Sequence, residues 1–228
     1  MTTSGLASRG LRAGRIGTYD PGVTAGPDIA VLPLTPGRWA DLADLFGPRG
    51  ADAGCWCMSF RVSSREWDWG GGDRRREQLR ALAGDDLAPG LLACAGDQAV
   101  GWVGLGPRTS FERLNRSRKY RALDALPVWS VVCFFIRRSA RSRGIGRLLL
   151  NAAVAYARDH GAAGAEGYAL APEGRMPSPN AYPGTVTMFE RAGFRRAKEV
   201  ASPGGLHQRW IMRLEFGSPA EAGASTAR

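Results

Sequence analysis

The hydrophobic residues of this chain recur with two spacings, one typical of strands and one typical of amphipathic helices. The longest apolar run, VWSVVCFFI at residues 128–136, predicts a strand that is buried on both faces. This run is shorter than the roughly 18 residues that a membrane span needs. Beyond it, apolar side chains return every three or four residues from Leu148 until Gly161, which predicts a long helix with one buried face.

The other elements are predicted from the same two spacings together with turn residues. Thr35 and Pro36 open a helix that Gly47 ends, and Thr187 with Glu190 has the spacing of a capping box. Predicted strands are residues 29–34, the two arms of a hairpin within 90–106, 129–136, 163–170, 194–202 and 207–216. Predicted helices are residues 35–47, 73–84, 111–123, 147–161 and 185–193.

In chain order these elements are β, α, α, β, β, α, β, α, β, α, β, β. Strands 129–136 and 163–170 are joined through a helix, and such a crossover requires the two strands to be parallel. The hairpin and the last two strands are expected to be antiparallel instead. We therefore expect an α/β fold of the α+β type, with a mixed central sheet that helices flank.

The two ends of the chain lack this patterning. Residues 1–28 contain arginines and glycines but no apolar stretch suited to a secretory signal, and residues 217–228 are mostly small. We expect both to be disordered extensions of a single domain at 29–216. Four cysteines are too few for an oxidised scaffold, so we expect a cytoplasmic protein.

Positive charge is concentrated in one part of the chain. Residues 108–147 hold eleven basic and two acidic side chains, a net charge of +9 out of +10 for all 228 residues. Arginine supplies nearly all of it, since the lysines of the chain are Lys119 and Lys198 alone. Charge that is this local indicates a specific anionic partner rather than a generally adhesive surface.

The sequence RSRGIGR at 141–147 lies between the buried strand and the long helix. This position places main-chain N–H groups and a helix N-terminus at the end of a strand, which makes an anion site. Gly144 and Gly146 let the main chain approach a phosphate closely, and Arg141 and Arg143 add charged donors. The P-loop pattern GxxxxGK[ST] does not occur, and a third glycine and acidic residue of a dinucleotide fingerprint are missing.

These residues resemble a known family. IRRSARSRGIG is similar to the pyrophosphate loop of GNAT acyl-CoA N-acyltransferases, with Arg141, Gly144 and Gly146 at the three signature positions of R/Q-x-x-G-x-G/A. FERAGF at 189–194 resembles the Y-E-K-x-G-F segment that closes the family's penultimate helix. With the order of elements, the resemblance covers roughly residues 29–216.

The resemblance implies a GNAT-like domain that uses acetyl-CoA, or another acyl-CoA, to acylate an amine of a small molecule or peptide. The pantetheine arm is expected where two parallel strands splay apart, and a main-chain N–H near Phe134 is expected to polarise the thioester carbonyl. The residues assigned to the coenzyme in this way are Phe134, Phe135, Ile136, Arg141, Ser142, Arg143, Gly144, Ile145, Gly146 and Arg147.

The sequence departs from the family pattern at the groups that transfer protons. Phe189 stands where the family has a tyrosine that protonates the departing thiolate, and the central strand carries no carboxylate. We expect Glu166 on the adjacent strand to be the base, with Tyr168 and Tyr182 as substitute acids. The alternatives are a solvent-facing Glu166, a covalent route through Cys133 in place of its packing in the core, and catalysis by positioning alone.

Two other functions stay open. Residues 108–121 suit a GNAT-fold transferase that takes its acyl group from an aminoacyl-tRNA, and Phe189 suits an inactive module that binds coenzyme A or nucleic acid. The C-x-C pair Cys55 and Cys57 lacks a second pair, so we expect no metal site. We expect no nucleic-acid or membrane partner, and a homodimer is left open.

Overall fold

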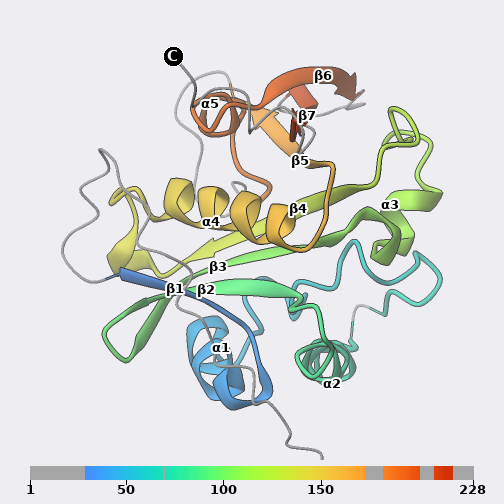
Figure 1. Cartoon of the computed structure of the whole chain (residues 1–228). Coiled ribbons are helices and arrows are strands. Elements are labelled where there is room, and N and C mark those ends of the chain that lie inside the picture. The colour runs from blue at the N-terminus through green and yellow to red at the C-terminus, as the bar shows by residue number, and fades with distance from the viewer. Residues whose placement is uncertain (1–28, 69, 173–181, 201–207, 218–228) are drawn as a thin grey trace, which may run out of the picture.

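The computed structural model describes residues 29–68, 70–172, 182–200 and 208–217. The expectations for the two ends of the chain lie outside these residues. Within the described part, seven strands form one sheet in the order β1-β2-β3-β4-β5-β7-β6 (Figure 1). The strands are β1 (Ile29–Pro33), β2 (Gly90–Ala95), β3 (Gln98–Pro107), β4 (Val128–Ile136), β5 (Gly164–Ala171), β6 (Arg195–Val200) and β7 (Gln208–Glu215).

All neighbouring strands are antiparallel except β4 and β5, which are parallel. This confirms the mixed sheet and the crossover that joins these two strands. The helices are α1 (Trp39–Phe46), α2 (Gly72–Leu82), α3 (Glu112–Arg116), α4 (Ile145–Asp159) and α5 (Val186–Glu190). The order of strands and helices is therefore the predicted one.

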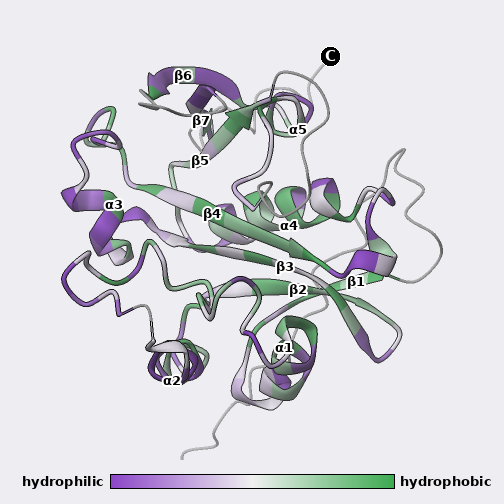
Figure 2. Ribbon diagram, turned by 180° about the vertical axis from the view of Figure 1, so that it is seen from behind, coloured by the Kyte–Doolittle hydropathy of each residue, from purple (hydrophilic) through white to green (hydrophobic). Residues whose placement is uncertain are grey.

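Helices cover both faces of the sheet. α4 and α5 pack on one face, where Val103 and Leu149 are fully buried, and α1 and α2 pack on the other, over Leu92 and Trp102 (Figure 1). Figure 2 shows the strands β2 to β4 in the hydrophobic colour, whereas α2, α3 and β6 are largely hydrophilic. Burial of such side chains stabilises each layer by roughly 1.5–3 kcal/mol per residue.

Several predicted helix boundaries differ from the structure, and tertiary contacts explain two of them. The helix predicted over 111–123 ends at Arg116, because Ser117 is extended, bends and a turn follow it, and the Tyr120 carbonyl accepts a hydrogen bond from Arg108. The cap of α5 is Thr185 rather than Thr187: the Thr185 side chain accepts from the Met188 N–H at 3.3 Å. Thr185 is available for this because an isolated bridge to β5 holds it extended.

β4 and β5 pair over only four residues, ending at Val131 and Gly167. The next residue of β4, Val132, is an extra residue opposite β3 and forms a bulge. Such a bulge bends its strand and ends regular pairing. Gly167 also leaves room for the ring of Phe189, which would lie 2.2 Å from a Cβ atom at that position. The packing of α5 against β5 therefore occurs at the point where β4 and β5 separate.

Beyond this point the segment 182–185 lies between the two strands. The Phe134 N–H donates to the Tyr182 carbonyl at 2.6 Å, and the Leu170 N–H donates to the Gly184 carbonyl at 3.0 Å. At the splayed ends of β4 and β5, these main-chain N–H groups thus find their hydrogen-bond acceptors in a segment that comes later in the chain.

We expect Gly167→Ala to lower the free energy of unfolding by about 2 kcal/mol. The added methyl group would overlap the ring of Phe189, which is fully buried and has no room to move. Urea denaturation measures the loss, with Gly37→Ala as the control because the nearest atom to its new Cβ is 4.0 Å away. Equal stability of the two variants would contradict the packing described for α5.

Candidate coenzyme and acyl-transfer site

The glycine turn joins β4 to α4 through two residues with left-handed main chain. Ser142 has a φ of 62° and Gly144, the N-cap of α4, has a φ of 76°. No side chain caps α4, and its first turn carries no acidic residue. The positive end of the helix dipole is therefore left without a negative group from the helix itself.

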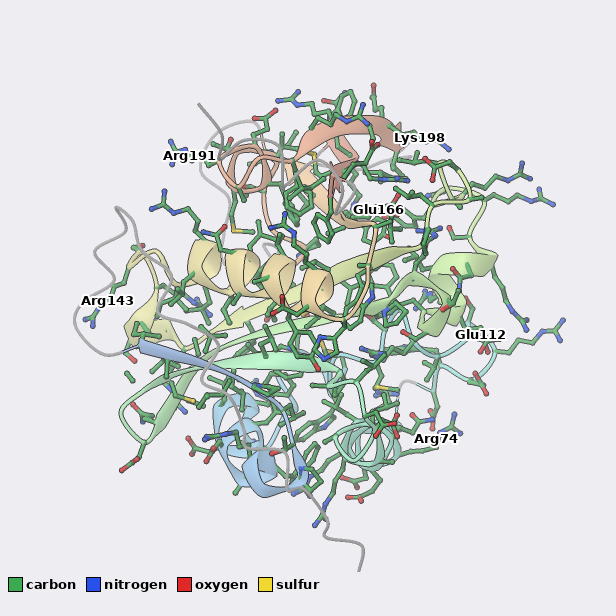
Figure 3. All side chains as sticks on the ribbon, viewed as in Figure 1. Arg74, Glu112, Arg143, Glu166, Arg191 and Lys198 are labelled. Atoms are coloured by element: carbon green, nitrogen blue, oxygen red, sulfur yellow. The ribbon has the colours of Figure 1, made fainter. Side chains whose placement is uncertain are left out.

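The main-chain N–H groups of the turn point to an anion site. Those of Arg143, Gly144, Ile145 and Gly146 donate to no acceptor within the described part of the chain. Free N–H groups at a helix N-terminus bind phosphate and carboxylate groups. Arg143 is exposed beside them, at one extremity of the molecule (Figure 3), and Arg147 follows in the first turn of α4.

Two arginines brace the turn. The Arg141 Nε donates to the Ile136 carbonyl at 3.0 Å, which ties the turn to the end of β4. Arg137 forms an ion pair with Asp44 of α1 at 2.6 Å. These contacts hold the turn to the end of β4 and the residue that follows β4 to α1.

The residues expected to face the pantetheine arm already have partners in the chain. The Phe134 N–H and the Ile136 carbonyl are used as described above, and the ring of Phe135 stacks on that of Tyr182 with centroids 6.3 Å apart. The structure brings Tyr182 to this position, although it lies on no predicted element. Pairing of a coenzyme with the Phe134 N–H stays a prediction, and it requires the Tyr182 carbonyl to be displaced.

Glu166 lies in a buried ion network. It is 1% exposed, so the alternative of a solvent-facing side chain is wrong. Its carboxylate accepts from Arg213 at 2.9 Å and from Arg108 at 3.1 Å. The Tyr168 hydroxyl joins the same network, 2.8 Å from both Arg108 and the Ser130 Oγ. The role of Glu166 as a base stays a prediction, and its visible role is to hold β5 against β7 and the end of β3.

The two tyrosines expected as acids keep their protons at neutral pH. Burial raises the pKa of Tyr168, and the nearby charge of Glu166 acts in the same direction. Burial also raises the pKa of Tyr182, which is only half-buried. Tyr168 is tied into the ion network, whereas Tyr182 lies beside the splayed end of β4.

Two cysteine thiols meet over the bulge of β4. The Cys57 Sγ accepts the indole N–H of Trp102 at 3.1 Å and lies 2.8 Å from the position of a Cβ on Gly104. Cys133, the cross-strand partner of Gly104, packs against the cluster that contains Cys57. The interaction between the two thiols lowers the pKa of Cys57 and raises the pKa of Cys133 well above its ordinary value. Cys133 is therefore a protonated, packed thiol, which disfavours a covalent route through it.

A cavity of about 630 Å³ lies between the end of α1 and the start of α2. Trp56 forms part of its wall together with charged residues of both signs, including Asp44 and Arg76. Trp56 and Cys57 have left-handed main chain, with φ values of 42° and 57°. Strained conformations of this kind cluster at functional sites.

With this geometry in place, comparison with known proteins identifies the family. The model of the acetyltransferase (GNAT) family matches residues 57–175, a little over half of the chain. The chain belongs to the GNAT acetyltransferase family. Comparison with curated protein sequences finds no match.

Solved structures show the same fold. A Drosophila melanogaster polyamine N-acetyltransferase, which forms N-acetylagmatine, is 14% identical with a TM-score of 0.51, and the match covers 83% of this chain and 100% of that one. A Corynebacterium glutamicum protein, histone acetyltransferase HPA2 and related acetyltransferase, is 18% identical with a TM-score of 0.50, covering 84% of this chain and 98% of that one. At these identities the likeness extends to the fold.

The described residues lack two further features. None of the helices there has the length and apolar character needed to cross a membrane. No group of three or more His, Cys, Asp or Glu side chains in the described ranges is placed to hold a metal ion.

Sequence reasoning missed the partners of Glu166 and the contact between Cys57 and Cys133. A glutamate within an apolar strand is itself a signal, because a buried carboxylate requires a cation nearby. The signal does not say which cation, and the chain offers 31 arginines and lysines. Arg213 lies directly across from Glu166 in the register of β5 and β7, which only the sheet topology reveals.

We expect Glu166→Gln to lower the free energy of unfolding by about 3–5 kcal/mol, because it leaves Arg108 buried without a counter-charge and leaves Arg213 with the more exposed Asp124 alone. Glu112→Gln is the matched control, since Glu112 pairs with Arg116 at the surface, where an ion pair contributes less than about 1 kcal/mol. Guanidinium denaturation of both variants makes the comparison. Small and equal losses would mean that the network does not hold the sheet.

Proposed function

We propose that this acetyltransferase takes the acetyl group of acetyl-CoA and transfers it to an amine of a small molecule or peptide. The observation that supports the donor is the set of unpartnered N–H groups from Arg143 to Gly146 at the N-terminus of α4. A diphosphate presents only acceptor oxygens, and these N–H groups are donors without a partner. When bound, the coenzyme would supply an acyl group activated as a thioester.

The residues of the turn would have different roles in binding the coenzyme. The main chain from Arg143 to Gly146 would donate to the diphosphate, while the guanidinium groups of Arg143 and Arg147 would neutralise its charge. Arg141 would act mainly by holding the turn on Ile136, since its Nε is already bound there. The Phe134 N–H would polarise the thioester carbonyl after release from Tyr182.

Attack by the amine forms a C–N bond and breaks the C–S bond, so one proton must leave the nitrogen and one must reach the sulfur. We propose Tyr182 as the acid, because it is protonated at neutral pH and lies beside Phe134. Glu166 and Tyr168 are bound to arginines in the core. We therefore propose that they position β5 beside β4, and that the amine loses its proton to water.

Acetyl-CoA at 100 times its Kd is expected to stabilise the protein by about 2.7 kcal/mol. Gly144→Val should abolish this effect, because a β-branched side chain is strained at a φ of 76° and obstructs the N–H groups. Thermal-shift titration measures it, with Arg121→Ala as a control that removes a basic side chain elsewhere. An unchanged shift in Gly144→Val would refute the assignment of the turn, and stabilisation by aminoacyl-tRNA instead would identify a different donor.

Tyr182→Phe is expected to lower kcat by about tenfold or more while the Tm changes little, because only the hydroxyl proton is lost. The alkaline limb of the wild-type kcat profile should lie above the ordinary pKa of tyrosine, since burial raises the pKa of Tyr182 and the acid acts only while protonated. Thiol release monitors turnover, and Tyr120→Phe serves as the control. Full activity in Tyr182→Phe would place the acid elsewhere.

A further inference from the structure

The basic residues of 108–147 form two groups that lie far apart. One group precedes β4 in the chain and the other follows it, so the length of the nine-residue strand separates them. At the usual rise per residue this is about 25 Å. Figure 3 shows the separation, with Arg143 at one extremity and Glu112 of α3 at the other. A diphosphate held by the glycine turn therefore does not reach the first group.

Most of the first group is not used inside the protein. Arg108 is buried with Glu166, but the five later members are exposed. These are Arg113, Arg116, Arg118, Lys119 and Arg121. Glu112 forms an ion pair with Arg116, and Asp124 is turned to Arg213. Like charges gathered at a surface repel one another unless an anion binds among them.

Some of these basic residues line a second cavity. It has a volume of about 300 Å³ and lies between the segment before α2 and the end of α3. Its wall consists of three arginines and three serines: Ser63, Ser64, Arg65, Arg113, Arg116 and Ser117. No carboxylate is part of this wall. The nearby Glu66 instead accepts from the Ser63 N–H at 3.0 Å.

These side chains select for a phosphate group. Guanidinium groups donate in fixed forks and serine hydroxyls add further donors, whereas phosphate oxygens only accept. A carboxylate has two oxygens, which a single arginine fork satisfies, while a tetrahedral phosphate can take donors from several directions. The volume is at the small end for ligand sites, which suits one phosphate and its nearest atoms but not a nucleic-acid helix.

One segment connects the cavity with the bulge of β4. The Arg113 N–H donates to the Phe60 carbonyl at 3.1 Å, and the Arg113 side chain donates to the Ser59 carbonyl at 3.3 Å. Phe60 packs on the cluster that contains Val132, the bulge residue of β4. Residues 57–65 therefore lead from the cysteine at the bulge to the wall of this cavity.

We propose that this cavity binds the phosphate group of the acceptor, so that the substrate is an amine that also carries a phosphate. This inference rests on the proposed function for its second half, the acylation of the amine. The phosphate site itself depends only on the arginines and serines of the wall.

Inorganic phosphate is the probe, titrated calorimetrically at constant ionic strength. Three double variants are compared with the wild type: Arg113→Gln with Arg116→Gln in the cavity, Arg118→Gln with Arg121→Gln beside it, and Arg143→Gln with Arg147→Gln in the glycine turn. The first two double variants remove the same number of charges from the same region. Arg65→Gln, a single variant in the cavity wall, is added because Arg65 is exposed and its replacement should not impair folding. The result then does not depend on correct folding of the first double variant.

The cavity variant and Arg65→Gln are expected to lose phosphate affinity by tenfold or more at one site, and the variant beside it by less than twofold. Equal losses in both neighbouring variants, or none in the cavity variant, would overturn the proposal. So would tight binding of a single-stranded RNA that depends on Arg118 and Arg121. Failure of acetyl-CoA to bind would instead refute the proposed function and leave this phosphate titration unaffected.

Acceptor choice is tested separately with matched amines. Phosphoethanolamine and O-phosphoserine are compared with ethanolamine and serine by thiol release from acetyl-CoA. The wild type should turn over the phosphorylated amines at least tenfold faster in kcat/KM, and the cavity variant should lose that preference. A wild type that prefers the unphosphorylated amines would overturn the assignment of the cavity to the acceptor.

Discussion

The hydrogen bonding between β4 and β5 stops after four residue pairs, and the candidate site depends on that stop. Main-chain groups in the middle of a sheet need partners, and strands that part lose theirs. Here the bulge at Val132 bends β4, and the ring of Phe189 occupies the space that Gly167 leaves on β5. The unpaired groups of both strands then bind the segment 182–185. A ligand that enters between the strands has to offer the same hydrogen bonds.

The ion network under β5 constrains the other side of this opening. Glu166, Arg108 and Arg213 come from three strands or their ends, and each side chain is at most 10% exposed. A buried ion pair contributes little net stability, because desolvation offsets the attraction. Its geometry is nevertheless demanding, since a misplaced strand would leave a charge without a partner. The network thus favours one placement of β5 relative to β7 and the segment before β4.

The two groups of basic residues lie at opposite ends of β4. The glycine turn lies after the strand and presents main-chain donors with arginines, while the serine and arginine cavity lies before it. A transferase that joins two substrates needs a separate anchor for each, with the reacting groups meeting between them. The arrangement of the two basic groups suits this requirement, with the bulge of β4 between them.

Much of the fold could be predicted from the sequence because the signals are local. The apolar run of β4, the period of α4 and the turn residues at Gly47 and Gly96 depend on neighbours a few residues away. The glycine turn was predictable for the same reason, since strand, turn and helix are consecutive. The predictions erred at 117–123 and at Thr187, where contacts with distant residues decide the conformation.

The sequence by itself determined the order of elements, the parallel crossover and the glycine turn between β4 and α4, because each follows from residues close together in the chain. Only the tertiary structure decided the partners of the candidate catalytic residues. Arg108 and Arg213 lie 58 and 47 residues from Glu166, and Tyr182 reaches Phe134 from a loop. A buried charge or an unpaired N–H group requires a partner, but the register of the strands selects which one it meets.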